Sequence, residues 1–490
     1  MTTTSTERTG SRPNARTIIE KIWDQHVVVD LGHGSALLHL DRIFMHEKTG
    51  GRMLRGVRDG GRQPARPELV FGTFDHVIDT QPGRDDTTLF PGGAEFISLY
   101  RDEARRVHVP LIEIDDPRQG IVHVVSPELG IALPGTTFVC GDSHTSTVGA
   151  VGALAWGIGV TQGEHAIATQ TLRQRWPGTM RVRFDGRPGP GVSAKDLALT
   201  LIGRYGATGG RGRAIELTGP AIEALDMAGR MTLCNMAVEF DAWTAIIAPD
   251  DKTMAFLEGT EYAPAGAAWD QAVASWRRLP SDDDAHFDDE LTLDAGAVVP
   301  QVTWGTSPEH VVAIDGVVPD PSRARDAAAR AAAERALAYS ALTPGTAVET
   351  VPVDAAFIGS CTNSRLDDLR AAAAILRGRR VAEGVLAICV PGSTGVKHAA
   401  EAEGLDEVFR EAGFEWRESG CSLCVYIQGD SFGTAQRVIS TTNRNFENRQ
   451  GAGVRSHLAS PATVAASAVT GHITDPRRLA PAGPIRVVTP

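Results

Sequence analysis

The stretch VDAAFIGSCTNSRLDDLRAAAAILRG, residues 353–378, indicates how this chain folds. The segment VDAAFIGS predicts a buried strand that ends in a Gly–Ser turn. A helix is predicted after the turn, and it ends at Gly378 because glycine readily adopts the left-handed conformation of a helix C-terminus. The apolar face of this helix is made by Leu366, Leu369, Ala373 and Leu376. A buried strand joined to an amphipathic helix is the repeating unit of α/β proteins.

The same design recurs elsewhere in the chain. The segment LAICVPGSTGVKHAAEAEG, residues 386–404, again predicts strand, turn and helix. Near the start, four apolar residues between Ile18 and Trp23 recur at helical spacing and predict the first helix. We therefore expect the α/β class. Cys361 directly follows the strand of the first segment, and open α/β sheets bind ligands at the carboxyl ends of their strands.

Length and composition limit the architecture. The 490 residues exceed one hydrophobic core, so two to four domains are expected at roughly 100–200 residues per domain. The chain is 42% hydrophobic and 22% charged, which is typical of globular proteins. No apolar run approaches the roughly 20 residues of a membrane-spanning helix, and residues 1–15 lack the apolar core of a secretory signal. We expect a disordered tail at residues 1–15, no membrane contact and a cytoplasmic location.

Charge and cysteine usage exclude further classes. The net charge of −12 argues against a nucleic-acid binder, because phosphate binding draws on clustered Lys and Arg. Acidic small molecules stay open as substrates, since a few inward-facing arginines reverse the local field. The acidic run at residues 281–290 is expected to be a solvated loop. Six cysteines in a chain this long are not a disulfide framework, so buried thiols or a metal site are expected.

Three of the cysteines form the most informative pattern. Cys361 lies in GSCTNS, and Cys421 and Cys424 lie in GCSLC, where the C-x-x-C spacing lets two thiolates reach one centre. Zinc, a redox-active dithiol and coincidence compete for such a motif, although zinc lacks a fourth ligand motif here. Three thiolates from two loops also suit a four-iron cluster with one iron free of protein ligands. Such an iron can act as a Lewis acid on a substrate.

Histidines stand beside polar residues after several strand-like runs. These positions are Asp75–His76, His123 and Asp142–Ser143–His144. Sequence neighbours in a strand point apart, so spacing alone makes no serine-hydrolase triad of them, and capping or coincidence explains most such pairs. An imidazole held by a carboxylate nevertheless has a pKa that suits general acid catalysis.

Other polar segments have more than one interpretation. In CNMAVEF, Asn235 and Glu239 could be a helix cap and a surface carboxylate. The run TNRNFENRQ resembles an exposed loop, yet the forked guanidinium of arginine matches carboxylates. The glycine patterns GIGVTQG (157–163) and GSTGVK (392–397) lack the full spacing of nucleotide-binding loops, so we expect close packing at strand–helix turns.

Longer motifs place these residues in one setting. The strings GSCTNSRLDDLRAAA, GCSLC and STTNRNFENRQGAG resemble the cluster and substrate motifs of the aconitase superfamily, from about Thr17 to about Arg477. Within the superfamily, the chain is most similar to large subunits of the isopropylmalate dehydratase type. The resemblance implies an aconitase-like architecture of three α/β domains, residues 16–178, 179–315 and 316–490, around a [4Fe–4S] cluster.

The resemblance also implies a role for each matching residue. The cluster ligands would be Cys361, Cys421 and Cys424. The other cysteines, Cys140, Cys234 and Cys389, lie outside the ligand motifs and would be structural or lie around the ligands. The catalytic, proton-handling residues would be Asp75, His76, His123, Asp142, Ser143, His144 and Glu239. The substrate-binding residues would be His46, Arg444 and Arg449. The cluster-supporting residues would be Asn235, Asn363 and Asn443.

The implied activity isomerises 2-isopropylmalate to 3-isopropylmalate by dehydration and rehydration, as in leucine biosynthesis. The substrate would be a dicarboxylic hydroxy acid. The superfamily also requires a swivelling domain that supplies a serine base, and this chain leaves no room for that domain before Pro490. A separate small subunit is therefore expected, and the isolated chain should bind its cluster yet turn over little substrate.

Some positions depart from the leucine-pathway pattern, chiefly Asp241, Trp243, Tyr426 and Gln428. They leave open a dedicated enzyme for another 2-substituted malate in a secondary or catabolic pathway. An RNA-binding regulator formed on cluster loss is a further alternative, against which the acidic balance and the missing fourth domain weigh. A non-catalytic metal store fits less well, because the set of proton-handling residues is complete.

Overall fold

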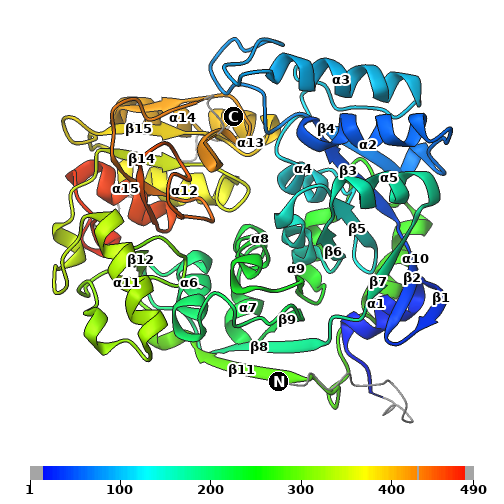
Figure 1. The fold of residues 1–490 in the computed structure, drawn as a ribbon, viewed down its shortest axis with the longest axis horizontal. Helices are drawn as coiled ribbons and strands as arrows, with labels where there is room; N and C mark the ends of the chain where they lie inside the picture. The colour runs from blue at the N-terminus through cyan, green and yellow to red at the C-terminus, as the bar shows by residue number, and fades with distance from the viewer. Residues whose placement is uncertain (1–14, 427–429, 480–490) are drawn as a thin grey trace.

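The computed structural model describes residues 15–426 and 430–479. The tail expected at residues 1–15 lies outside the described residues except for Ala15. The described chain mixes helices with three parallel sheets, which lie at the right, the bottom and the upper left of Figure 1. The α/β class predicted from the sequence is therefore confirmed.

The first parallel sheet has the order β4-β3-β5-β6. Its strands are β3 (Arg42–His46), β4 (Val70–Thr73), β5 (Thr137–Cys140) and β6 (Leu154–Gly157). The helices of this part are α2 (Glu47–Asp59), α3 (Gly93–Arg106), α4 (Val122–Glu128) and α5 (Val160–Thr169). Because the strands are parallel, the residues that follow β3, β4 and β5 gather at one edge of the sheet. That edge carries His46, Asp75, His76 and Asp142.

The second parallel sheet has the order β10-β9-β8-β11. Its strands are β8 (Thr179–Asp185), β9 (Ala214–Thr218), β10 (Thr244–Ile246) and β11 (Asp289–Asp294). The helices are α6 (Ala194–Tyr205), α7 (Pro220–Ala224), α8 (Met227–Met236), α9 (Asp251–Leu257) and α10 (Ala267–Trp276).

The acidic run at residues 281–290 is not entirely the solvated loop that its composition predicts. Asp289 and Glu290 open strand β11, which pairs in parallel with β8. Their carboxylates form ion pairs with Arg213 and Arg181 respectively. Arg181 lies in β8 and Arg213 directly precedes β9. Cross-strand charge pairing therefore stabilises an edge strand that local composition disfavours.

The third parallel sheet has the order β16-β15-β14-β17-β18. Its strands are β14 (Ala355–Ile358), β15 (Leu386–Cys389), β16 (Phe414–Trp416), β17 (Arg437–Ser440) and β18 (Arg455–Leu458). The helices are α12 (Leu366–Leu376), α13 (Thr394–Ala402), α14 (Leu405–Ala412) and α15 (Pro461–Thr470). Strands are added on both sides of β14, so the order reverses beside it. Cys361 follows β14 and lies at this reversal point, where α/β sheets place their ligands.

Shorter elements connect the three sheets. Helix α1 (Ile18–His26) precedes an antiparallel sheet of β1 (Val27–Gly32), β2 (Ser35–His39) and β7 (Thr171–Arg175). A hairpin of β12 (Gln301–Thr303) and β13 (Val311–Ala313) precedes the Ala-rich helix α11 (Ala327–Ser340). The 3-10 helices are η1 (Pro67–Leu69), η2 (Ser143–Val151), η3 (Ala237–Phe240), η4 (Ala295–Ala297), η5 (Pro321–Arg323), η6 (Val348–Thr350), η7 (Ser422–Cys424) and η8 (Pro476–Arg478).

Buried side chains confirm the predicted helix faces. In α1 the buried residues are Ile18, Ile19, Ile22 and Trp23. In α12, Leu369, Ala373 and Leu376 are buried, whereas Leu366 is half-buried. One apolar core joins the first and second sheets, and a second core surrounds the third sheet. The boundaries after residues 178 and 315 fall between sheets, but the core is continuous across the first of them, so the domain division stays a prediction.

Both glycine patterns set aside as nucleotide loops lie at strand–helix turns. Gly163 in α5 contacts Met53, and Gly392 after β15 contacts Ser364, so that an added Cβ would clash at either position. Close packing therefore explains these glycines. Across residues 15–426 and 430–479, no helix is long and apolar enough to cross a membrane.

A half-buried ion pair anchors the end of α1. His26 Nε2 lies 2.7 Å from Asp41 Oδ2, and His26 Nδ1 lies 2.7 Å from the carbonyl oxygen of Ile22. Burial favours neutral forms of both groups, but their hydrogen bond and mutual attraction outweigh it. The pKa of His26 is raised above 6.5 and the pKa of Asp41 is lowered below 3.8.

We expect His26→Gln to destabilise the fold in a pH-dependent way. The raised pKa of His26 gives stability that is complete below pH 6.5 and is lost as the pH rises through the folded-state value. The lowered pKa of Asp41 gives stability that is present above pH 3.8 and is lost at lower pH. The gap between wild-type and variant urea midpoints should therefore be larger at about pH 5.5 than at about pH 9. An equal gap at both pH values would refute this assignment.

Candidate active site

The three motif cysteines line one cavity. Cys361, Cys421 and Cys424 share a cavity of about 160 Å³ with most of the predicted proton-handling residues. The predicted residues that line it are Asp75, His76, His123, Asp142, Ser143, His144, Arg444 and Arg449. The fold thus brings together segments that lie more than 300 residues apart in the sequence, from β4 to the loop after β17.

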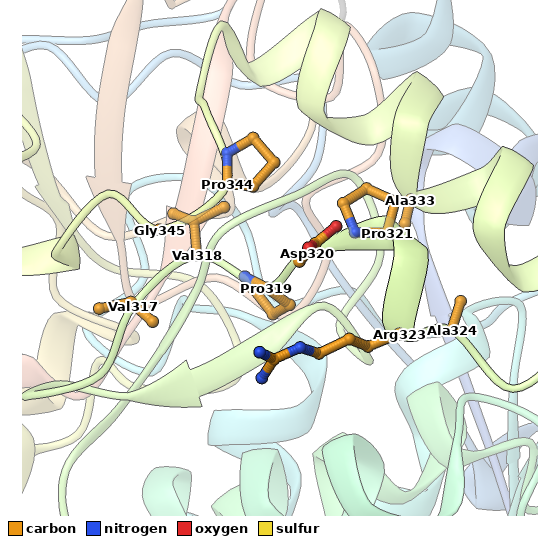
Figure 2. A pocket seen from close by; sticks show the side chains of 10 residues that line it. All are labelled: Val317, Val318, Pro319, Asp320, Pro321, Arg323, Ala324, Ala333, Pro344 and Gly345. Carbon is orange, nitrogen blue, oxygen red and sulfur yellow. The ribbon is translucent and has the colours of Figure 1, made fainter.

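Cavity size alone does not identify this site. A groove of about 580 Å³ lies beside α11 and is lined mainly by proline, valine and alanine, with Asp320 and Arg323 (Figure 2). It contains no cysteine or histidine. The smaller cavity is the candidate active site because titratable and metal-ligating groups converge there.

Backbone contacts fix both cysteine loops. Arg365 donates to the carbonyl oxygens of Cys361 and Thr362 at 2.9 and 3.0 Å. The backbone N–H of Cys421 donates to the carbonyl oxygen of Asp75 at 2.8 Å. The second contact joins the C-x-x-C loop of the third sheet to the residues that follow β4 of the first sheet. The cysteines and the histidines are therefore held in a fixed position relative to one another.

Each motif sulfur has a polar neighbour. Asn235 Nδ2 lies 3.1 Å from Cys361 Sγ, and Asn443 Nδ2 lies 3.6 Å from the same sulfur. Arg449 Nη2 lies 3.9 Å from Cys424 Sγ, and His76 Nδ1 lies 3.9 Å from Cys421 Sγ. N–H groups around sulfur favour thiolate ligands of an iron–sulfur cluster.

The spacing of the sulfurs bears on the metal. In the described part of the chain, the one trio of Cys, His, Asp or Glu ligand atoms within 4.8 Å of one another is His46, Asp75 and His76. A single tetrahedral zinc ion holds its sulfurs within about 3.8 Å of one another, given Zn–S bonds of about 2.3 Å. The three cysteines are spread more widely, so they fit a multi-iron cluster better than one zinc ion.

The thiols themselves are unequal. A hydrogen bond from Cys361 and the nearby charge of Arg449 lower the pKa of Cys424 to about 5, against the effect of burial. That hydrogen bond, together with burial, raises the pKa of Cys361 well above its usual value. The remaining cysteines, Cys140, Cys234 and Cys389, are fully buried and do not line the cavity. A structural role for them agrees with this placement.

Asp75 and His76 form the first histidine–carboxylate pair. His76 Nδ1 lies 2.5 Å from Asp75 Oδ1, and His76 Nε2 lies 3.4 Å from Asp142 Oδ2. Burial works against the charged imidazole, yet Asp75, the Cys421 sulfur and Asp142 raise the pKa of His76 well above 6.5. The buried carboxylate of Glu47 accepts backbone N–H groups from Asp75 and His76 at 3.1 and 2.8 Å. These contacts favour the protonated form of His76 and fix the position of its ring.

Asp142 joins three histidines. It accepts from His123 Nε2 at 2.9 Å and from the backbone N–H of His144 at 2.7 Å, besides its contact with His76. Burial raises the pKa of Asp142, but hydrogen bonds from His123, His144 and His76 lower it well below 3.8. Nδ1 of His123 is buried and has no hydrogen-bond partner among the described residues.

A second chain of charges runs through His144. Its Nε2 lies 2.9 Å from Glu239 Oε1, and the same oxygen lies 2.7 Å from Arg444 Nε. Burial raises the pKa of Glu239, but His144 and Arg444 lower it below its usual value. Ser143 Oγ lies 3.3 Å from His144 Nδ1. Glu239 therefore positions both an imidazole and an arginine, although it does not itself line the cavity.

Two predicted residues lie differently from the rest. His46 does not line the cavity, and its ring stacks on His76 at 4.0 Å between centroids. Burial and the neighbouring His76 lower the pKa of His46 to about 4, so it is neutral. Asn363 donates to Thr232 and Asp368 at 3.1 and 2.9 Å, and within residues 15–426 and 430–479 no hydrogen bond joins it to a sulfur. Its support of a cluster would act through the loop rather than through the ligands.

Of the positions that depart from the family pattern, Trp243 lies beside the site. Trp243 stacks on Trp156 and lines a second cavity, of about 350 Å³, that shares Asp142 and Ser143 with the first. Asp241 has a left-handed backbone, and its carbonyl oxygen accepts from Gly212. The N–H of Tyr426 donates to the carbonyl oxygen of Arg449. Gln428 lies outside the described residues.

Sequence reasoning missed several residues of the site. Lys48, Ile121 and Val425 line the cavity, and Glu47 holds the loop after β4. Glu47 and Lys48 directly follow His46, so their position after a predicted strand is a signal that could have identified them. Ile121 carries no such signal, because an apolar residue before a helix is usually part of the core.

Comparisons with known proteins agree with this geometry. The profile of the aconitase family (aconitate hydratase) matches residues 20–471. A protein of Bradyrhizobium diazoefficiens named 3-isopropylmalate dehydratase large subunit 1 is 52% identical over 464 residues, which are 95% of this chain and 97% of the relative. The resemblance inferred from the motifs is thereby confirmed.

Replacing Cys421 with Ala is expected to abolish stable iron binding, because one of three sulfurs is lost. Iron and acid-labile sulfide per chain, measured after anaerobic reconstitution, test this. Cys389→Ala is the matched control, since that buried sulfur does not line the cavity, and it should keep the wild-type iron content. Full iron retention by the Cys421 variant would show that the ligand assignment is wrong.

Proposed function

The chain belongs to the aconitase family, and we propose that it is the large subunit of a hydro-lyase that isomerises 2-isopropylmalate to 3-isopropylmalate in leucine biosynthesis. The observation that carries this proposal is one cavity in which three buried cysteines, charge-paired histidines and two arginines meet. The name of the relative that is 52% identical supports the substrate. The reaction removes water from one carbon and returns the hydroxyl to its neighbour.

A [4Fe–4S] cluster is the cofactor that fits the three cysteines. When bound, it supplies an iron without a protein ligand, a Lewis acid for the hydroxyl and carboxylate of the substrate. Cys361, Cys421 and Cys424 would hold it. Asn235 and Asn443 would orient the sulfur of Cys361, and Arg449 would orient the sulfur of Cys424, since N–H groups beside sulfur orient such ligands and adjust their basicity.

The arginines would bind a carboxylate of the substrate. Arg444 is held by Glu239 through its Nε, which leaves its terminal nitrogens for a ligand. Arg449 stacks over the ring of Phe446 at 5.2 Å, and its buried Nε has no partner among the described residues. A forked guanidinium held by such contacts suits bidentate binding of a carboxylate.

His76 is the proposed acid. Its proton would pass to the departing hydroxyl, which leaves as water while a base removes the proton from the adjacent carbon and the alkene forms. Rehydration reverses these transfers with the two carbons exchanged. Asp75 and Asp142 keep the imidazolium charged and oriented, so that the proton is positioned before the C–O bond breaks. The small cavity limits escape of the alkene.

A small subunit would complete the enzyme. The relative is named a large subunit, which implies a partner for that protein. We propose that the partner of this chain carries the swivelling domain and the serine that acts as base, and that both work in the cytoplasm. Neither nucleic acid nor membrane is required for this reaction.

The test is an assay of the anaerobically purified chain with a small subunit of this family, on a panel of 2-substituted malates, by absorbance of the alkene. We expect 2- and 3-isopropylmalate to be preferred, and the chain alone to hold iron yet turn over little. Preference for another malate would overturn the substrate, and substantial turnover by the chain alone would overturn the two-subunit arrangement.

A further inference from the structure

One cation of the active-site cavity makes no polar contact with the described part of the chain. Lys48, in the first turn of α2, lines the cavity together with Arg444 and Arg449. Arg444 is paired with Glu239, and Arg449 contacts the sulfur of Cys424 and the ring of Phe446. Within residues 15–426 and 430–479, Lys48 makes no hydrogen bond and no ion pair.

The anionic groups around Lys48 are already engaged. Asp75 accepts from His76 and from the backbone N–H of Val122. Asp142 accepts from His123 and from the N–H of His144. The adjacent Glu47 is buried and turned to the backbone of the loop after β4. Lys48 is half-buried and lines the cavity, so an anionic ligand in the cavity can pair with it without displacing an existing partner.

The cations come from separate parts of the fold. Lys48 follows β3 of the first sheet, whereas Arg444 and Arg449 follow β17 of the third sheet. A ligand with two carboxylates can pair with Lys48 on one side of the cavity and with the two arginines on the other side. We propose that Lys48 is a substrate-binding residue that pairs with one carboxylate of the substrate while the arginines hold the other. This inference rests on the proposed function, and it names a residue that fixes the dicarboxylate class of the substrate.

The test compares Lys48→Met with Lys48→Arg in the cluster-loaded complex with the small subunit. The readouts are KM for 2-isopropylmalate and the inhibition constant of 2-isopropylsuccinate, a dicarboxylate without the reacting hydroxyl. Loss of a charged hydrogen bond should raise KM and the inhibition constant of Lys48→Met by about 10- to 100-fold. In Lys48→Arg, both constants should return most of the way to their wild-type values. Arg55→Met is the matched control, because Arg55 lies on the same helix, is 52% exposed and has Glu103 as its nearest acid, and it should leave both unchanged.

Monoamides of 2-isopropylsuccinate locate the contact. With the amide at the carboxylate that Lys48 holds, wild type and Lys48→Met should bind equally weakly, whereas the other monoamide should still discriminate between them. Equal inhibition constants of 2-isopropylsuccinate for wild type and Lys48→Met would overturn the inference. The inference would also be overturned if the sole effect of Lys48→Met were a higher concentration of small subunit at half-maximal activity, since Lys48 would then contact the partner. A wild-type complex that binds 2-isopropylsuccinate but does not turn over isopropylmalate would refute the proposed function and still leave the Lys48 comparison decisive.

Discussion

The carboxylate of Asp142 is the acceptor on which the arrangement of the site depends. It receives hydrogen bonds from His123 and from the backbone of His144, and it lies 3.4 Å from His76. Burial penalises a lone charge, so such a carboxylate is tolerated only where several donors face it. Segments after β4 and β5 and helix α4 must therefore converge, which builds the histidine wall of the cavity.

Contacts between the sheets hold the cysteine loops in place beside these histidines. The N–H of Cys421 donates to the carbonyl oxygen of Asp75 and links the third sheet to the first. From the second sheet, the fully buried Lys195 of α6 donates to the carbonyl oxygens of Thr441 and Thr442, directly before Asn443. Burial lowers the pKa of Lys195 to about 7, which shows how costly this link is. All three sheets thus hold one site, so a shift in one of them would move ligands and proton donors together.

Sequence patterns predicted the parts of this site that local chemistry determines. The strand before Cys361, the helix after it and the C-x-x-C loop follow from apolar spacing and glycine placement, and the structure confirms them. The family motifs then placed the histidines, arginines and cysteines that line the cavity.

Orientation could not be predicted in the same way. Asn363 lies in the cysteine motif, yet its amide turns to Thr232 and Asp368, because α8 packs against that loop. Lys48 belongs to none of the sequence motifs. It is identified because it has no polar partner among the described residues, and only the folded structure shows this. Asp289 and Glu290 open a strand in which Arg213 and Arg181 pair with their carboxylates. In each case a contact between residues far apart in the sequence decides the outcome.

The central claim is that three cysteines bind four irons and leave one of them open to the substrate. Mössbauer spectroscopy of the complex, reconstituted with ⁵⁷Fe, measures this most directly when spectra are compared with and without 2-isopropylmalate. Three irons should keep their signal, and the fourth should shift when the substrate binds. The claim would be contradicted if the substrate left the signals of all four irons unchanged, or if the spectrum showed no four-iron cluster.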